Sequence, residues 1–142
     1  MSICRWDRGA TAAIEHAGPR WAGVWSLLYT AGSATTTLAA RVPLLVGAEL
    51  TWAAMSLRWA RDALEHTHGE LPFTSPTVEL PDLEPDDDPA AAGALVGWLT
   101  DAVLERLELI LEAVSDETER DLAERVASLV RTARPTLAEL AQ

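Results

Sequence analysis

A short stretch near the middle of the chain, DALEHTHGE, concentrates side chains of the kinds that bind metal ions. It contains the nitrogen and oxygen donors Asp62, Glu65, His66, His68 and Glu70. On a helix, the first two share a face with His66 beside it, and the last two come where the helix is expected to end. The stretch is a candidate site for Zn²⁺ or Mg²⁺. The alternative is a helix C-terminus, where the helix dipole favours a partly protonated imidazole.

A second candidate is a row of carboxylates further along the chain. Spacings of three or four residues place these side chains on one face of a helix; they are Asp101, Glu105, Glu108 and Glu112. The row resembles the carboxylate rows of the all-helical nucleotide pyrophosphohydrolases, which hold magnesium between facing helices. The resemblance covers one helix, and the paired acidic motif of a second helix is not evident. It implies a metal-dependent hydrolase, and the alternative is a solvated face of a helical bundle.

Glu49 is the third candidate, because of where helical periodicity places it. At about 100° per residue, it points away from the polar side of its helix and lies near Trp52. A carboxylate in a core must find a partner or take up a proton, since burying an unpaired charge is costly. We therefore predict a binding pocket in which Glu49 is surrounded by Trp21, Trp25, Trp52 and Trp59. The alternative is a structural ion pair, or a glutamate near the helix start that reaches solvent.

The segment between Arg20 and Arg41 contains no charged side chain. It is too polar for a membrane span, which needs about 20 predominantly apolar residues. Several of its hydroxyl groups fall on one narrow stripe at helical spacing, made of Ser26, Thr30, Ser33 and Thr37. A neutral stripe permits close approach of another helix, so it predicts a homodimer that pairs through this helix. The alternatives are an exposed face that is simply uncharged and a contact with a membrane surface.

Charge limits the partners that the chain can bind. The 142 residues carry a formal net charge of −11, whereas binding nucleic acid needs a clustered surplus of basic residues. Residues 1–70 contain six arginines and six acidic residues, and residues 71–142 contain five arginines and sixteen acidic residues. We expect no nucleic-acid partner, and we expect self-association to use the less acidic first half because like charges repel.

Other features of the composition indicate the source and the cellular location of the protein. The chain has no lysine and is rich in alanine and leucine, which is typical of a GC-rich bacterial genome. Cys4 is the single cysteine, which excludes an intrachain disulfide. The first fifteen residues mix charged side chains with few large apolar ones, unlike a signal peptide. We expect a bacterial protein of the cytoplasm.

Periodicity, caps and prolines predict four long helices, over residues 19–40, 43–66, 89–114 and 116–134. A short helix is expected over residues 7–17, and Pro135 is expected to open a short C-terminal helical turn. The residues from 69 to 89 include five prolines, which disfavour a long helix. We therefore predict a long acidic loop over residues 69–88. The expected fold is all-α, a single-domain antiparallel four-helix bundle of residues 1–142 with the short N-terminal helix added.

Together these features predict a non-enzymatic helical-bundle module without a cofactor. It would offer a surface or a tryptophan-lined apolar pocket to a protein or a small apolar ligand. Nucleophilic catalysis has no support, because the sequence contains no Gly-x-Ser-x-Gly motif and no phosphate-binding glycine loop. The alternative function is a metal-binding bundle or a metal-dependent hydrolase that uses the candidate donors.

Overall fold

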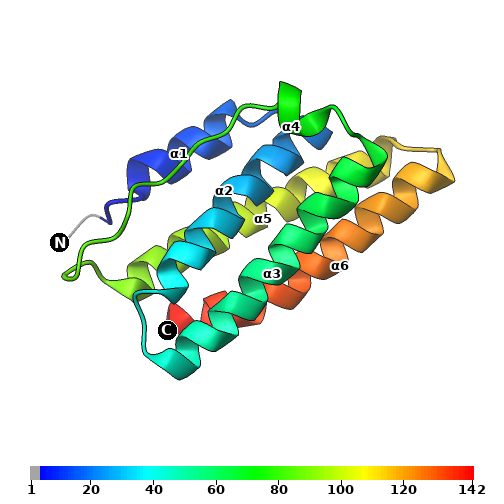
Figure 1. Ribbon diagram of the computed structural model, residues 1–142. Coiled ribbons are helices and arrows are strands. Elements are labelled where there is room, and N and C mark those ends of the chain that lie inside the picture. The colour runs from blue at the N-terminus through cyan, green and yellow to red at the C-terminus, as the bar shows by residue number, and fades with distance from the viewer. Residues whose placement is uncertain (1–3) are drawn as a thin grey trace.

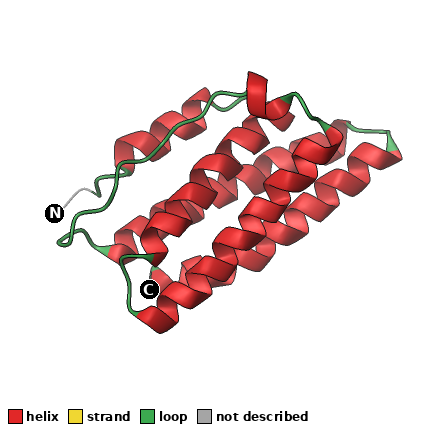
Figure 2. Ribbon diagram, viewed as in Figure 1, coloured by secondary structure: helices red, strands yellow, loops and turns green. Residues whose placement is uncertain are grey.

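The computed structural model describes residues 4–142, and this part of the chain contains helices and loops but no strand (Figures 1 and 2). The predicted all-α class with bundle-like packing is confirmed. No helix within these residues has the length and the apolar character that crossing a bilayer requires. The helices are α1 (Asp7–His16), α2 (Trp21–Ala39), α3 (Leu44–Thr67), α4 (Leu71–Thr74), α5 (Pro89–Ala113) and α6 (Glu117–Leu140).

The four long helices enclose the core (Figure 1). Helices α2 and α6 each pack against both α3 and α5, so every long helix has two long neighbours, and α1 lies against α2 and α5. Trp25 near the start of α2 contacts Glu65 near the end of α3, and Gly93 near the start of α5 lies beside Leu140 at the end of α6. The helices of each of these two pairs therefore run in opposite directions.

Two aspartates fix the starts of the last two helices, as their sequence positions predict. The side chain of Asp88 accepts a hydrogen bond from the backbone N–H of Ala90 (3.0 Å), and Pro89 occupies the first turn of α5. The side chain of Asp116 accepts from the N–H of Thr118 at the start of α6 (3.4 Å). Both are N-caps, which supply acceptors to N–H groups that have no partner inside the helix.

The end of α6 differs from the prediction. The helix runs through Pro135 to Leu140 without a break, instead of ending at Arg134 before a separate turn. Proline removes one backbone hydrogen bond and crowds the preceding turn. Pro135 itself is exposed, whereas Ala133 and Leu137 on either side of it are fully buried. Packing of this last stretch against the core outweighs the cost of the proline.

The predicted loop contains a short helix and an ordered strap. Leu71 is buried and anchors the four-residue helix α4, which the five prolines led the sequence prediction to miss. Residues 75–88, which we call the strap, then run without regular secondary structure beside α1 and over α2 (Figures 1 and 2). The strap packs closely enough that a methyl group at Gly9 of α1 would collide with Leu80.

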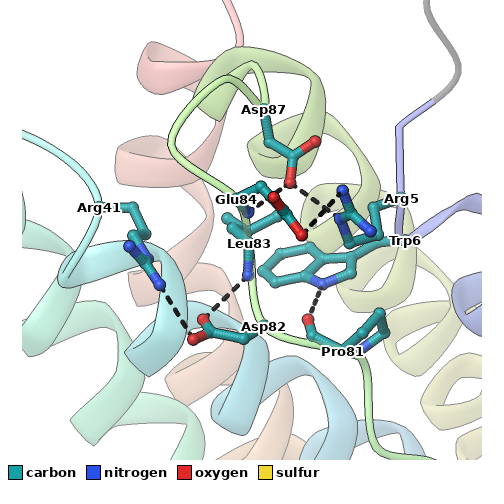
Figure 3. Close-up of polar contacts among 8 residues, drawn as sticks. All are labelled: Arg5, Trp6, Arg41, Pro81, Asp82, Leu83, Glu84 and Asp87. Atoms are coloured by element: carbon teal, nitrogen blue, oxygen red, sulfur yellow. Dashed lines mark hydrogen bonds and ion pairs between the residues drawn. The ribbon is translucent and has the colours of Figure 1, made fainter.

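Polar contacts hold the second half of the strap (Figure 3). The indole N–H of the fully buried Trp6 donates to the carbonyl of Pro81 (2.6 Å). Arg41 pairs with Asp82 (2.9 Å), and Arg5 pairs with Asp87 (3.0 Å). The strap is therefore attached to both the N-terminal segment and the end of α2.

Candidate functional site

The predicted pocket of four tryptophans around Glu49 does not form. Trp25 is only 4% exposed, and its indole N–H donates to Glu65 (2.9 Å). The ring of Trp21 lies 5.6 Å from the imidazole of His68, centroid to centroid. Trp52 and Trp59 instead face outward, with 66% and 47% of their surface exposed.

Glu49 is exposed, so the prediction that it lies in the core is wrong. The physical reason is that α3 is apolar on two opposite sides. Leu50, Leu57 and Leu64 are fully buried on the side that faces the bundle. Trp52 and Trp59 lie on the opposite side. Periodicity alone does not tell which apolar side of such a helix meets the core.

The outward side of α3 carries an apolar row, which we call the α3 stripe: Leu45, Ala48, Trp52, Met55 and Trp59. Its members are four and three residues apart in alternation, the spacing with which helices pack side by side in coiled coils. Leu45 is 83% exposed. Single exposed apolar residues are ordinary, but a continuous row of this size marks an interaction surface. It is the leading candidate for a functional site.

A groove between α3 and α6 continues from the end of the α3 stripe. It has a volume of about 590 Å³, and Trp59 forms part of both the stripe and the groove. The groove is also lined by Asp62 and His66 of α3, and by Asp121 and Arg125 of α6. None of these four charged or titratable side chains forms an ion pair within residues 4–142. They are available to polar groups of a partner.

The hydroxyl stripe of α2 has a different role from the one predicted. The hydroxyl of Ser26 donates to the carbonyl of Pro76 (2.6 Å), and that of Thr30 donates to the carbonyl of Val78 (2.7 Å). Both side chains are buried by the strap, so their prediction as contacts with a second subunit is wrong. Ser33 is exposed and Thr37 is half-buried. Another segment does pack against the first half of the stripe, but this segment is the strap of the same chain.

The donors of the DALEHTHGE stretch do not converge on one point. Asp62 and His66 line the α3/α6 groove, but Glu65 accepts the hydrogen bond of Trp25. His68 lies 3.1 Å from a carboxylate oxygen of Glu119. Within residues 4–142, no group of three or more His, Cys, Asp or Glu side chains is placed to hold a metal ion. The last turn of α3 uses these residues for contacts with α2 and α6.

The carboxylate row of α5 is divided between two environments. Asp101 forms an ion pair with Arg134 of α6 (2.6 Å). The remaining three members are exposed: Glu105, Glu108 and Glu112. This arrangement agrees with the alternative interpretation of the row as a solvated helix face.

Comparisons with protein-family models, curated proteins and solved structures find no match for this chain.

Sequence reasoning identified three residues of the α3/α6 groove and missed its α6 side. Trp59, Asp62 and His66 were candidates, whereas Asp121 and Arg125 were not. The last two are four residues apart on α6 and so share a face of that helix. This spacing is common on exposed helices, so only knowledge of the neighbouring helix distinguishes them from other surface charges.

Proposed function

We propose that this chain is a non-enzymatic helical-bundle module that forms a homodimer through the α3 stripe. The observation that carries the proposal is the exposure of this stripe on the side of α3 opposite the core. Removing apolar surface from water contributes roughly 25 cal/mol per Å². A stable interface covers about 800 Å² on each partner, about a tenth of the 7863 Å² surface of this chain. Trp52 and Trp59 are the side chains best suited to anchor it.

The spacing of the α3 stripe favours a second copy of the chain as its occupant. Leu45 and Trp59 lie seven residues on either side of Trp52. A two-fold axis that passes beside Trp52 would place this residue against its own copy and Leu45 against Trp59 of the other chain. Two-fold interfaces require a patch that is complementary to itself in this way. The contact would extend for about 21 Å along each helix, at 1.5 Å per residue.

Charge also favours this face over the others. Glu49 is the only acidic residue between residues 16 and 61, whereas residues 71–142 contain sixteen. Pairing through α5 or the strap would bring like charges together in a chain of net charge −11. Pairing through α3 keeps those charges apart. We therefore keep the expected homodimer but place its interface on α3 instead of α2.

Light scattering coupled to size-exclusion chromatography across a concentration series tests the proposal. We expect a dimer for the unmodified chain and a monomer for Trp52→Glu, because the substitution would bury a charge at the centre of the contact. Leu109→Glu is the matched control, since Leu109 is a large apolar residue of α5 that is 55% exposed. It should leave the dimer intact. A monomer at every concentration, or a dimer indifferent to Trp52→Glu, would reject the proposal.

Cysteine cross-linking tests the proposed register of the two helices. In a Cys4→Ser background, Trp52→Cys should form a disulfide between chains under mild oxidation, because the axis brings the two copies of this position together. Leu45→Cys alone should not. A mixture of Leu45→Cys and Trp59→Cys chains should cross-link with each other. Efficient cross-linking of Leu45→Cys with itself would indicate a parallel pairing and contradict the proposed axis.

A further inference from the structure

A second groove lies between α2 and α3, on the flank of the α3 stripe. It has a volume of about 220 Å³. Arg58 and Arg61 of α3 line it together with hydroxyl-bearing residues of both helices, and Leu28 and Met55 add apolar surface. None of its lining residues is acidic. The groove thus combines two positive charges with a short apolar wall in a chain whose net charge is −11.

The arginines of this groove have few carboxylate partners, because Arg61 forms only one long ion pair, with Glu65 four residues further along α3. Arg58 forms no ion pair within residues 4–142. The Nε atom of Arg61 is buried without a hydrogen-bond acceptor, and the nearest oxygen of Glu65 is 3.7 Å away from it. A buried donor that lacks an acceptor is costly. An anion bound in the groove would supply acceptors to both guanidinium groups.

Neighbouring groups restrict the position of Arg61. Its guanidinium carbon lies 5.4 Å from the centre of the Tyr29 ring, a distance at which a cation is attracted to an aromatic face. Fixing an arginine before a ligand arrives reduces the entropy that binding would cost. Arg58 lies one helical turn away on α3, so the two side chains can approach one ligand from the same helix.

The hydroxyl groups of the groove differ in what they offer to a ligand. Thr36 and Thr51 donate to the carbonyls of Gly32 and Gly47 (3.1 and 2.8 Å), four residues before them. Ser33 is exposed, and its hydroxyl makes no such bond within the described residues. Ser33 is therefore the hydroxyl free to donate to an anion.

We infer that the α2/α3 groove is a binding site for a small organic anion, with a phosphate or carboxylate head and a short apolar chain. Arg58 and Arg61 bind the head, Ser33 donates to it, and Leu28 and Met55 contact the chain. The volume of 220 Å³ equals that of about seven water molecules at about 30 Å³ each. A head group and a few carbon atoms would fill this volume. Met55 belongs both to this groove and to the α3 stripe, so the groove would lie at the edge of the proposed dimer contact, but the inference does not depend on the homodimer.

Isothermal titration calorimetry on the full chain tests the site with butyl phosphate, butanoate, inorganic phosphate and butanol as probes. We expect saturable binding of butyl phosphate or butanoate, and which of them binds more tightly identifies the head group. Inorganic phosphate should bind more weakly than butyl phosphate, because it lacks the apolar chain. Butanol should not bind, because it lacks the charge. Absence of saturable binding by both organic anions, or equal binding of butanol, overturns the inference.

Two substitutions locate the site. Arg58→Gln should weaken binding of the tighter anion by about tenfold or more, because a charge-assisted hydrogen bond is lost. Ser33→Val should weaken it by a smaller factor. Arg131→Gln is the matched control, since Arg131 is an exposed arginine of α6 that lies outside this groove. Arg58 is exposed and unpaired, so its loss should leave the fold intact. Equal affinity of the Arg58→Gln chain and the unmodified chain would overturn the assignment.

Discussion

The hydroxyl of Thr30 in α2 and the carbonyl of Val78 in the strap are 2.7 Å apart and form a hydrogen bond. Thr30 is 2% exposed, so its hydroxyl cannot exchange this partner for water without local opening. The bond connects residues 48 positions apart in the sequence. It makes the strap part of the folded structure, and the strap buries Ser26 and Thr30 of the stripe that the sequence had indicated as an interface.

Replacing Thr30 with valine should therefore destabilise the fold. Valine has a similar shape but leaves the carbonyl of Val78 without a donor, at a cost of about 1–3 kcal/mol. Thr36→Val is the control, because Thr36 is exposed and donates only to a carbonyl of its own helix. Urea unfolding followed by circular dichroism measures both changes. Equal and small effects at the two positions would show that the strap contributes little to the stability of the fold.

Arg106, the one arginine of α5, should be important for stability because it joins α5 to the end of α1. Its Nε atom donates to the carbonyl of Gly18 (2.9 Å), and its Nη2 atom donates to those of Ile14 (3.1 Å) and Ala17 (3.3 Å). It thus satisfies carbonyls at the end of α1 that have no partner within the helix. We expect Arg106→Gln to lower the free energy of unfolding by about 1–3 kcal/mol.

The control for Arg106 is Arg131→Gln, because Arg131 is an exposed residue of α6. Surface substitutions of this kind usually change stability by less than about 0.5 kcal/mol. Both variants can be compared by their urea midpoints. A midpoint of the Arg106→Gln variant that equals that of the Arg131→Gln variant would contradict the proposed role of Arg106 as a cap.

Two helical glycines should respond to alanine in opposite directions. A Cβ atom at Gly23 of α2 would collide with the backbone carbonyl of Gly18, whereas one at Gly97 of α5 would meet no atom within 4 Å. Gly97→Ala should stabilise the protein by about 0.5–1 kcal/mol, because alanine has the higher helix propensity. Gly23→Ala should destabilise it by about 1–3 kcal/mol through overpacking. Thermal unfolding of the two variants distinguishes these outcomes, and stabilisation by both would contradict the close approach at Gly23.

The features predicted well from the sequence are those determined by neighbouring residues. Asp88 and Asp116 cap the helices that follow them. Helical periodicity placed both ends of α2, α3 and α5, and the start of α6, within two residues. These signals depend on backbone groups two or three positions away. The start of a helix can therefore be recognised without knowledge of the fold.

The features that were missed depend on which segments meet in space. Glu49 was placed in the core because α3 has two apolar sides, and only packing selects one of them. The stripe containing Thr30 was interpreted as a contact with a second subunit, but the segment that covers Thr30 lies 48 residues away in the same chain. Arg106 gave no local signal, since the carbonyls that it binds belong to a helix almost 90 residues earlier.

Tyr29 provides a spectroscopic test of the strap, because it is the only tyrosine in the chain. Its hydroxyl donates to Glu79 of the strap (3.1 Å). This hydrogen bond is the largest cause of a raised Tyr29 pKa, and burial and the charge of Glu79 add to it, whereas Arg61 opposes it. The folded state therefore binds the phenolic proton more tightly than the unfolded state. The stabilisation from this contact is complete below the unfolded pKa of about 10 and is lost as the pH rises through the folded value.

Glu79→Gln should lower the Tyr29 pKa toward its ordinary value, because the substitution removes both the charged acceptor and the repulsion of the phenolate. Arg61→Gln should shift the pKa in the opposite direction, because Arg61 favours the phenolate. The ultraviolet absorbance of tyrosinate gives the titration midpoint of each variant. Glu84→Gln is the control, since Glu84 is an exposed strap residue that contacts Arg5 and not Tyr29. Identical midpoints for the unmodified chain and the Glu79→Gln chain would mean that this part of the strap does not contact Tyr29 in solution.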